Sequence, residues 1–320
     1  MIKKILLFFI NLIFYGTKRN SKKIKVLIGC YSFKEYTGSE LYVFELAKKL
    51  IEKDYEVYIV AKSIGNTLTY RARKLGIKVI PLKLIPSGIN FDIIHCQHKP
   101  IVEILIKKFP SIPKVCSIHS EVYELEDPVI HPSIYKYIAI RLEIKDHIIS
   151  KFGISSDIIE VIYNPIDELK FTKMSTVCKN YILFVGTIDN IRRQTIFDLI
   201  EYSKINNKEL WLVGKNHSNY ISEVMKNTHV RHFKETFHVE KFVAECYETA
   251  GVLLGRTTIE GWLCGKSGWI YNINSEGEIL NKKISTPPIN LNLYKSQFVT
   301  EQIIHLYLKV INNDSILLRD

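Results

Sequence analysis

From residue 25 to residue 163, the sequence alternates short β-branched apolar runs with segments whose apolar residues recur every three or four positions. The first pattern is typical of buried strands and the second of amphipathic helices. Strands separated by helices at this spacing form βαβ units, which build a parallel sheet with helices on both faces. The expected strands are 25–29, 56–61, 78–81, 91–95, 114–119, 137–139 and 160–163, and the expected helices are 39–53, 66–75, 102–109 and 142–152.

The pattern is lost in the polar stretch 165–180 and then resumes, with strands expected at 181–186, 210–214, 230–233, 252–254 and 268–271, and helices near 194–204, 218–226, 239–248 and 258–264. A length of 320 residues suits two domains. We therefore predict an α/β fold of two doubly wound Rossmann-like domains, 23–172 and 173–285, that face each other across a cleft. A helical tail, 286–320, should close the fold. Ligands of such sheets bind at the carboxyl ends of the strands, which places the expected site in the cleft.

Composition narrows the class of protein. Hydrophobic residues make up 47% and charged residues 24% of the chain, which disfavours long disorder and a multi-span membrane protein. The net charge of +11 favours anionic partners. The six cysteines include no Cys-x-x-Cys pair, so we expect buried thiols in a reducing, cytoplasmic compartment and no disulfide framework.

The first 22 residues form a separate segment, in which lysines flank an apolar stretch at 5–14. This stretch is shorter than the roughly 20 apolar residues that cross a bilayer. The pattern favours an interfacial helix whose basic flank contacts anionic lipid, so the protein would be peripheral on the inner face of the membrane. A helix packed on the body of the protein is the alternative.

Several common functional motifs are missing. The sequence has no Gly-x-Gly-x-x-Gly after a strand, no Walker-type loop, no Gly-x-Ser-x-Gly elbow and no His-Glu-x-x-His. Dehydrogenases, P-loop NTPases, α/β-hydrolases and zinc proteases therefore lose support. The lysines are scattered and show no basic stripe with interleaved aromatic residues, so we expect no nucleic-acid partner.

Two strand ends carry residues suited to a phosphorylated ligand. Gly38 and Ser39 follow the first strand and open a helix, where glycine allows close approach and the helix N-terminus attracts anions. An ordinary turn with Ser39 as N-cap explains this pattern equally well.

Gly186 ends the first strand of the second half, and Arg192 and Arg193 precede the next helix. The two guanidinium groups suit a diphosphate clamp, although a solvated charge pair gives the same pattern.

A third element spans 255–266, where a strand runs through a turn into a helix. Thr257 and Glu260 match the capping box, in which the glutamate satisfies backbone donors. Alternatively, the Glu260 carboxylate accepts hydrogen bonds from ribose hydroxyls while the amides of 255–258 face phosphate. The spacing alone favours the cap.

The histidines offer one candidate for a catalytic group. His119 ends a strand at the edge where the cleft should open, so it is placed to contact a reacting sugar. His95 and His98 flank Cys96, but the neighbouring sequence offers no third ligand, and we predict no metal site.

Taken in order over about residues 25–275, these elements resemble family four of the retaining glycosyltransferases, which have the GT-B arrangement of two Rossmann-like domains. The matching segments are the glycine loop at 37–40 with its helix at 44–50, the "pDviH" strand at 91–95, the "t-x-H" strand end at 117–119, the "vi-x-Asn-x-Asp…Phe" segment at 161–171, the donor loop at 184–192, "lvG-x-G" at 212–215 and "lEAmacGkP" at 259–266.

The resemblance implies roles for particular residues. Arg192 replaces the lysine that holds the donor diphosphate, Glu260 matches the glutamate that binds the donor ribose, and His119 matches the cleft histidine near the transferred sugar. Gly38 matches the loop that faces the donor phosphates. The remaining positions expected to bind the donor are Ser39, Gly186, Arg193, Gly214, Lys215, Thr257 and Thr258.

Two departures from the family pattern affect the donor site. Thr187 stands where the family has an arginine, and Val252 stands where it has an earlier glutamate, in a shortened loop.

The resemblance implies a retaining, hexosyltransferase-like enzyme that needs no metal. Such an enzyme would move sugar from a nucleotide-diphosphate donor to a glycan or lipid-linked acceptor in cell-surface polysaccharide synthesis. Thr187 and Val252 favour a second reading, a catalytically degenerate nucleotide-sugar-binding partner. A nucleotide-sugar epimerase on the same architecture is a third.

Overall fold

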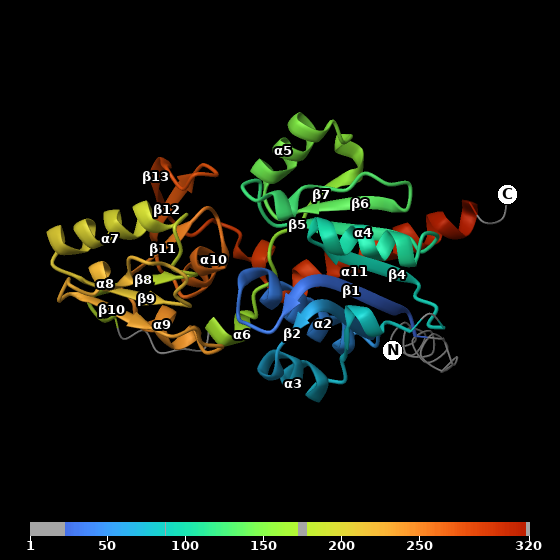
Figure 1. The fold of residues 1–320 in the computed structure, drawn as a ribbon, viewed down its shortest axis with the longest axis horizontal. Helices are drawn as coiled ribbons and strands as arrows, with labels where there is room; N and C mark the ends of the chain where they lie inside the picture. The colour runs from blue at the N-terminus through green and yellow to red at the C-terminus, as the bar shows by residue number, and fades with distance from the viewer. Residues whose placement is uncertain (1–22, 87, 172–177, 318–320) are drawn as a thin grey trace, which may run out of the picture.

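The computed structural model describes residues 23–86, 88–171 and 178–317, which form two α/β domains side by side (Figure 1). The first domain is built on a seven-stranded parallel sheet in the order β3-β2-β1-β4-β5-β6-β7. Its strands are β1 (Lys25–Phe33), β2 (Glu56–Ile64), β3 (Lys78–Pro81), β4 (Ile93–Gln97), β5 (Lys114–Ile118), β6 (Ile134–Ala139) and β7 (Ile159–Val161). The predicted doubly wound fold is confirmed here.

Helices connect these strands, as parallel pairing requires. They are α2 (Gly38–Glu52), α3 (Asn66–Lys74), α4 (Lys99–Lys108) and α5 (Leu142–Phe152), with the short α6 (Glu168–Phe171) after the last strand. All five residues of β4 and of β5 are buried, because helices cover both faces of the sheet. β1 extends four residues and β2 three residues beyond their predicted ends, and β4 begins two residues later than predicted and ends at Gln97.

The second domain has a six-stranded sheet in the order β10-β9-β8-β11-β12-β13. Its elements are β8 (Tyr181–Val185), α7 (Arg193–Ile205), β9 (Glu209–Val213), α8 (Ile221–Val224), β10 (Val230–Phe233), α9 (Glu240–Glu245), β11 (Glu248–Val252), α10 (Arg256–Leu263), β12 (Gly268–Ile273) and β13 (Ile279–Ser285). β13 pairs antiparallel with β12 and was not predicted, because its polar residues face solvent at the sheet edge.

One strand prediction was wrong. The apolar run 252–254 was expected to be a strand, but β11 spans Glu248–Val252. Its buried residues include Thr249 and Gly251, so hydrophobicity alone did not reveal the strand. Leu253 and Leu254 form the loop that follows.

The long C-terminal helix α11 (Ser296–Leu317) returns to the first domain and packs on α2 (Figure 1). Its buried Val299, Ile303 and Tyr307 belong to the hydrophobic core of that domain. The Tyr307 hydroxyl lies 2.6 Å from Nδ1 of the buried His95 on β4. Helix α11 is therefore part of the first domain's core and ties the two domains together a second time.

Aromatic and charged residues also join the domains near the cleft. Phe237, in the loop between β10 and α9, packs against Tyr36 and Phe44 with ring centroids 5.5 and 5.7 Å apart. The guanidinium of Arg71 and the ammonium of Lys170 lie 4.1 and 3.9 Å from the centre of the same ring. This cation–π arrangement anchors the second domain on the first.

The interfacial helix expected in residues 1–22 lies outside the described residues. Within the described ranges, no helix combines the length and hydrophobicity needed to span a membrane.

The buried hydroxyl of Tyr307 gives a test of how α11 stabilises the fold. Tyr307→Phe should lower the free energy of unfolding by about 1–3 kcal/mol, because it leaves a ring nitrogen of buried His95 without its partner. Tyr247→Phe is the matched control, since the Tyr247 side chain is exposed and should change stability by less than about 0.5 kcal/mol. Urea denaturation of both variants measures the difference, and equal stabilities would contradict this role.

Candidate active site

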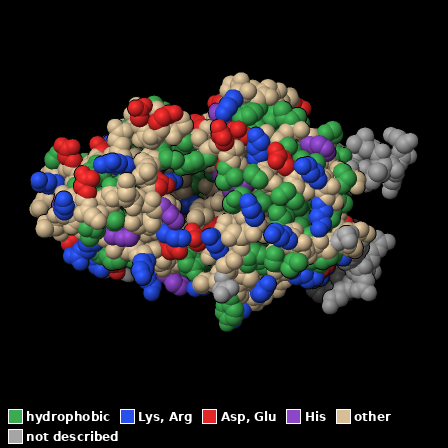
Figure 2. Space-filling model, viewed as in Figure 1, with side chains coloured by type: hydrophobic (Ala, Val, Ile, Leu, Met, Phe, Trp, Pro, Cys, Tyr) green, Lys and Arg blue, Asp and Glu red, His purple; other side chains and the backbone are tan. Residues whose placement is uncertain are grey.

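A cavity of about 380 Å³ lies between the two domains where the carboxyl ends of their strands face each other. The space-filling view shows the hollow between the two halves (Figure 2). Loops after β1 and β5 line it from the first domain, and loops after β8, β9 and β11 line it from the second. This is the position that the fold predicts for a ligand.

All but one of the predicted site residues line this cavity. From the first domain they are Gly38, Ser39 and His119, and from the second Gly186, Arg192, Gly214, Lys215, Thr257, Thr258 and Glu260. Arg193 is the exception. It starts α7 on the outer surface, where its guanidinium pairs with Glu223 at 3.4 Å and lies 5.4 and 5.5 Å from the ring centres of Phe197 and Tyr220. Thr187, which stands where the resemblance implies an arginine, does line the cavity. Arg193 lies outside the cavity and therefore does not supply the positive charge that Thr187 lacks there.

Two glycines shape the part of the cavity that the second domain lines. Gly214 directly follows β9 and lies close to Gly186. A Cβ atom added to Gly214 would overlap the carbonyl oxygen of Gly186. The neighbouring strand ends thus carry backbone without side chains, which leaves room for a ligand to approach the main chain.

Every cation that lines the cavity among the described residues pairs with a carboxylate. Arg192 pairs with Asp189, and its guanidinium also lies 3.5 Å from the Tyr123 hydroxyl of the first domain. The Lys215 ammonium reaches across to Glu35 of the first domain at 2.6 Å. The other two pairs are Arg141 with Glu121 and Arg256 with Glu260. An incoming anion must therefore compete with these carboxylates or share their cations.

Helix α10 begins at the cavity, and the capping box predicted for it does not form. Gly255 is the N-cap and offers no side-chain acceptor, while the Thr257 hydroxyl donates to the Val185 carbonyl at 3.1 Å. The Glu260 carboxylate pairs instead with Arg256 at 3.2 Å. Burial raises the pKa of Glu260, and the positive charge of Arg256 opposes this shift. The first turn of α10 is therefore free of side-chain caps and faces the cavity.

The N-terminus of α2 also differs from its prediction. Thr37, and not Ser39, is the N-cap, and Glu40 completes a capping box. The Glu40 carboxylate also accepts hydrogen bonds from the backbone N–H groups of Lys34 and Glu35 at 3.1 and 2.8 Å. Glu40 thus holds the loop 34–37, which leads into Gly38 and Ser39 at the start of α2.

The loop after β11 is apolar and strained. Val252, Leu253 and Leu254 line the cavity, and Leu253 has a φ of 59°. A left-handed conformation costs a non-glycine residue about 1–3 kcal/mol and often marks a functional site. The structure thus places an apolar wall at Val252, the position where the resemblance implies a glutamate.

His119 lies on the opposite wall in a network of buried polar groups. Its Nε2 lies 2.6 Å from Oε1 of Gln97, and its backbone N–H donates to Glu126 at 3.1 Å. Glu126 also pairs with His98 at 3.2 Å. Burial lowers the pKa of His119 to about 4, while the charge of Glu126 raises it and that of His98 lowers it. His119 is therefore neutral at physiological pH.

His95 and His98 do not share a metal site. His95 is enclosed by Tyr307 and Ser117, whereas His98 contacts Glu126 and the Tyr31 amide. In the described parts of the chain, no group of three or more histidine, cysteine, aspartate or glutamate side chains is arranged to hold a metal ion.

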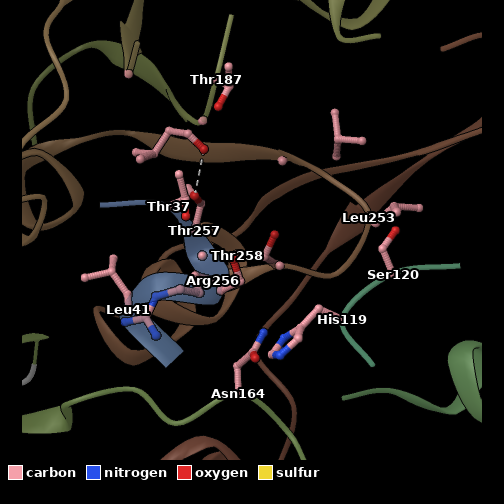
Figure 3. Close-up of a pocket in the computed structure, with 18 of the residues that line it drawn as sticks. Thr37, Leu41, His119, Ser120, Asn164, Thr187, Leu253, Arg256, Thr257 and Thr258 are labelled. Carbon is pink, nitrogen blue, oxygen red and sulfur yellow. Dashed lines mark hydrogen bonds between the residues drawn. The ribbon is translucent and has the colours of Figure 1, made fainter. Parts of the chain in front are cut away.

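Two cavity residues that the sequence did not single out for the site, Asn164 and Arg256, carry buried polar groups. Oδ1 of Asn164 and Nε of Arg256, together with Oγ1 of the predicted Thr258, make no hydrogen bond in the described structure. Gln97 is buried behind the wall that His119 forms. Figure 3 shows Asn164, His119, Arg256 and Thr258 around the same space. Buried polar atoms normally find a partner, so these unpaired groups indicate a water or ligand position. Asn164 lies within the "vi-x-Asn-x-Asp" segment, the one signal that pointed to it.

Comparison with known proteins agrees with this geometry. Residues 36–168, in the first domain, match the family described as Glycosyltransferase Family 4. No curated protein has a sequence that matches the chain.

Solved structures with the same fold cover both domains. Anabaena HepE, crystallised with UDP and glucose, is 14% identical with a TM-score of 0.70, and the alignment covers 88% of this chain and 99% of HepE. A glycosyltransferase from Rickettsia africae is 16% identical with a TM-score of 0.66, covering 91% of this chain and all of the other. The UDP-GlcNAc 2-epimerase of Methanocaldococcus jannaschii is 12% identical with a TM-score of 0.57, covering 90% and 100%. The chain has the GT-B fold of these structures, and its first domain matches a glycosyltransferase family.

The lowered pKa values of His95 and His119 predict that the stability of the fold depends on pH. The folded-state pKa values of His95 and His119, about 3 and about 4, lie below the ordinary value of 6.5. The unfolded chain therefore takes up protons first as the pH falls, and stability is lost. From pH 6.5 to about pH 5 the free energy of unfolding should fall by up to about 1.4 kcal/mol per pH unit for each imidazole.

Urea denaturation at a series of pH values measures this slope. His119→Gln should remove about half of the two-imidazole contribution. An unchanged slope in that variant would show that His119 is not held neutral in the folded state.

Proposed function

We propose that this protein is a glycosyltransferase that takes a sugar from a nucleotide-diphosphate donor bound in the interdomain cavity. The observation that carries the proposal is the start of helix α10. Its uncapped first turn, the unpartnered hydroxyl of Thr258 and the guanidinium of Arg192 all face one cavity. A helix N-terminus with a neighbouring arginine suits the phosphates of such a donor.

In this arrangement Arg192 stabilises the negative charge that develops on the leaving diphosphate. Its side chain is about one quarter exposed, and its partner Asp189 lies only three positions away. Asp189 therefore orients the guanidinium from the same loop through a charge-assisted hydrogen bond. The backbone amides of α10 supply further donors, so the protein's own groups would stabilise the leaving group without a required metal.

Glu260 is proposed to bind the donor ribose. Its side chain is 4% exposed, lines the cavity and is held by Arg256. The Arg256 guanidinium also donates to the Pro165 carbonyl at 3.0 Å, which links the carboxylate to the segment between the domains. A carboxylate with a fixed position can accept hydrogen bonds from two adjacent hydroxyl groups.

UDP is the first nucleotide to test, because Anabaena HepE was crystallised with UDP. We propose hexosyl transfer with retention, based on the resemblance to family four. The acceptor would enter over the first domain, where His119, Ser120 and Arg141 line the cavity. A glycan or lipid-linked acceptor in cell-surface polysaccharide synthesis, and a cytoplasmic location at the membrane, are proposed from the basic and apolar residues 1–23 of the sequence.

A specific observation favours a second candidate, a nucleotide-sugar-binding partner without catalysis. The wall formed by Val252, Leu253 and Leu254 offers no polar side chain to a donor sugar, and Thr187 offers no positive charge. The third candidate, an epimerase, shares the fold with the Methanocaldococcus protein. It would form product from the nucleotide sugar with no acceptor added.

Arg192 and Arg193 give a matched pair of variants for the central experiment. We expect Arg192→Ala to lower kcat/KM by about 10²-fold or more, as loss of a donor to a developing oxyanion does. Arg193→Ala should change it less than about twofold, because Arg193 lies outside the cavity. Turnover is measured with UDP-, GDP- and ADP-sugars by release of the nucleoside diphosphate. Equal losses in the two variants would contradict the proposed site.

Glu260→Ala separates the candidates further. We expect weaker donor binding in thermal-shift titrations with UDP and reduced turnover. Binding of nucleoside diphosphates by the unmodified chain without turnover of any donor would favour the non-catalytic partner. Undiminished turnover in both Arg192→Ala and Glu260→Ala would reject the site.

A further inference from the structure

Gln97 occupies an unusual position behind the first-domain wall of the cavity. It is the last residue of β4, and only 2% of its surface is exposed. Its amide nitrogen donates to the Ser39 carbonyl at 3.2 Å, and its amide oxygen lies 2.6 Å from Nε2 of His119. This one side chain therefore connects the first turn of α2, which contains Gly38 and Ser39, with the histidine that directly follows the neighbouring strand β5.

The chemistry of these partners fixes where the protons lie. The Ser39 carbonyl oxygen can only accept, so the NH₂ group of Gln97 must face it and the amide oxygen must face His119. An amide oxygen can also only accept, so Nε2 of His119 must carry a hydrogen. A neutral imidazole carries one hydrogen, and its other nitrogen, Nδ1, then has a free lone pair.

The His119 ring is held in one orientation. The edge-to-face contact with buried Tyr42 has a centroid distance of 4.7 Å, and the hydrogen bond to Gln97 fixes the rotation of the ring. Nδ1 makes no hydrogen bond with the described residues, although His119 is half-buried and lines the cavity. Figure 3 shows His119 pointing into the space between the domains.

We propose that Gln97 is a positioning residue that holds His119 in the Nε2–H form, so that Nδ1 accepts a hydrogen bond from a hydroxyl group of the bound sugar. This inference rests on the proposed function, because it names the chemical group that the same cavity recognises. A neutral acceptor pairs with a hydroxyl donor but not with a carboxylate or phosphate. The sugar atom against His119 is therefore a hydroxyl oxygen.

The first test reads the tautomer directly and needs no ligand. The full chain is labelled with ¹⁵N-histidine, and long-range ¹H–¹⁵N NMR at neutral pH identifies the protonated nitrogen of His119, whose signal is assigned by its absence in His119→Gln. We expect Nε2–H in the unmodified protein and a shift toward Nδ1–H in Gln97→Met, which removes the acceptor. Gln297→Met, on helix α11, is the matched control and should leave the signal unchanged.

Nδ1–H in the unmodified chain, or an unaltered tautomer in Gln97→Met, would overturn the proposal. Gln97→Glu provides a second variant in case Gln97→Met does not fold. Its carboxylate still accepts from Nε2, so the Nε2–H form should persist at high pH. Its negative charge should also move the protonation of His119 to higher pH.

The second test uses activity. The groups that face His119 are Glu126 from the turn after β5, His98 and His95 from β4 and its end, and Tyr42 from α2. None of them is altered in Gln97→Glu. Turnover of that variant should therefore rise with pH over a range in which the unmodified enzyme is constant, because a protonated Nδ1 no longer accepts. Parallel pH profiles would count against the proposal.

Substrate analogues identify the hydroxyl. We expect Gln97→Met to lower kcat/KM for UDP-glucose about tenfold, the loss of roughly one hydrogen bond. For one monodeoxy analogue of UDP-glucose, the unmodified enzyme should show a similar loss and Gln97→Met no further loss. Additive losses for every analogue would overturn the proposed contact.

The two proposals fail in different ways. If the unmodified chain turns over no UDP-, GDP- or ADP-sugar, the proposed function fails, and the NMR result still decides the tautomer. If transfer occurs and His119 carries its proton on Nδ1, the function stands and the role of Gln97 is rejected.

Discussion

The opposition of two parallel sheets is the constraint on which the rest of this structure depends. Parallel strands all end at one edge of a sheet, and their connecting loops must leave from that edge. Here the carboxyl ends of the two sheets face each other, so ten of the predicted site residues meet in one cavity although they are spread from residue 38 to residue 260. Helix α11 maintains this arrangement because it returns from the second domain and buries Tyr307 in the first.

The charges of the cavity are balanced in a way that suits a negatively charged ligand. Two of the pairs join cation and carboxylate within one loop or helix turn, as Arg192 does with Asp189 and Arg256 with Glu260. Lys215 differs, because its partner Glu35 belongs to the other domain. A separation of the domains would free the Lys215 ammonium while leaving the other two guanidinium groups oriented.

The wall around His119 is built differently from the wall that carries Arg192. It contains neutral or internally paired groups, and burial keeps the His119 imidazole uncharged. The second domain offers arginines and an uncapped helix start, whereas the groups around His119 in the first domain are neutral or already paired. This division would suit the two parts of the proposed donor, an anionic diphosphate and a neutral sugar ring.

The sequence by itself determined the fold class, because hydrophobic periodicity reports which residues are buried in each element. It located most strands and helices, and ten of the eleven site residues that it named line the cavity, since strand ends and glycine loops are local patterns. Tertiary structure alone decided the rest. Arg192 and Arg193 are adjacent in sequence, yet the direction in which α7 begins places only Arg192 in the cavity. Thr257 and Glu260 have the spacing of a capping box, but Val185 and Arg256 take their polar atoms instead. Gln97 has no local pattern, because its partners lie 58 and 22 residues away. Contacts between distant segments depend on how the sheets pack, and no short stretch of sequence encodes that packing.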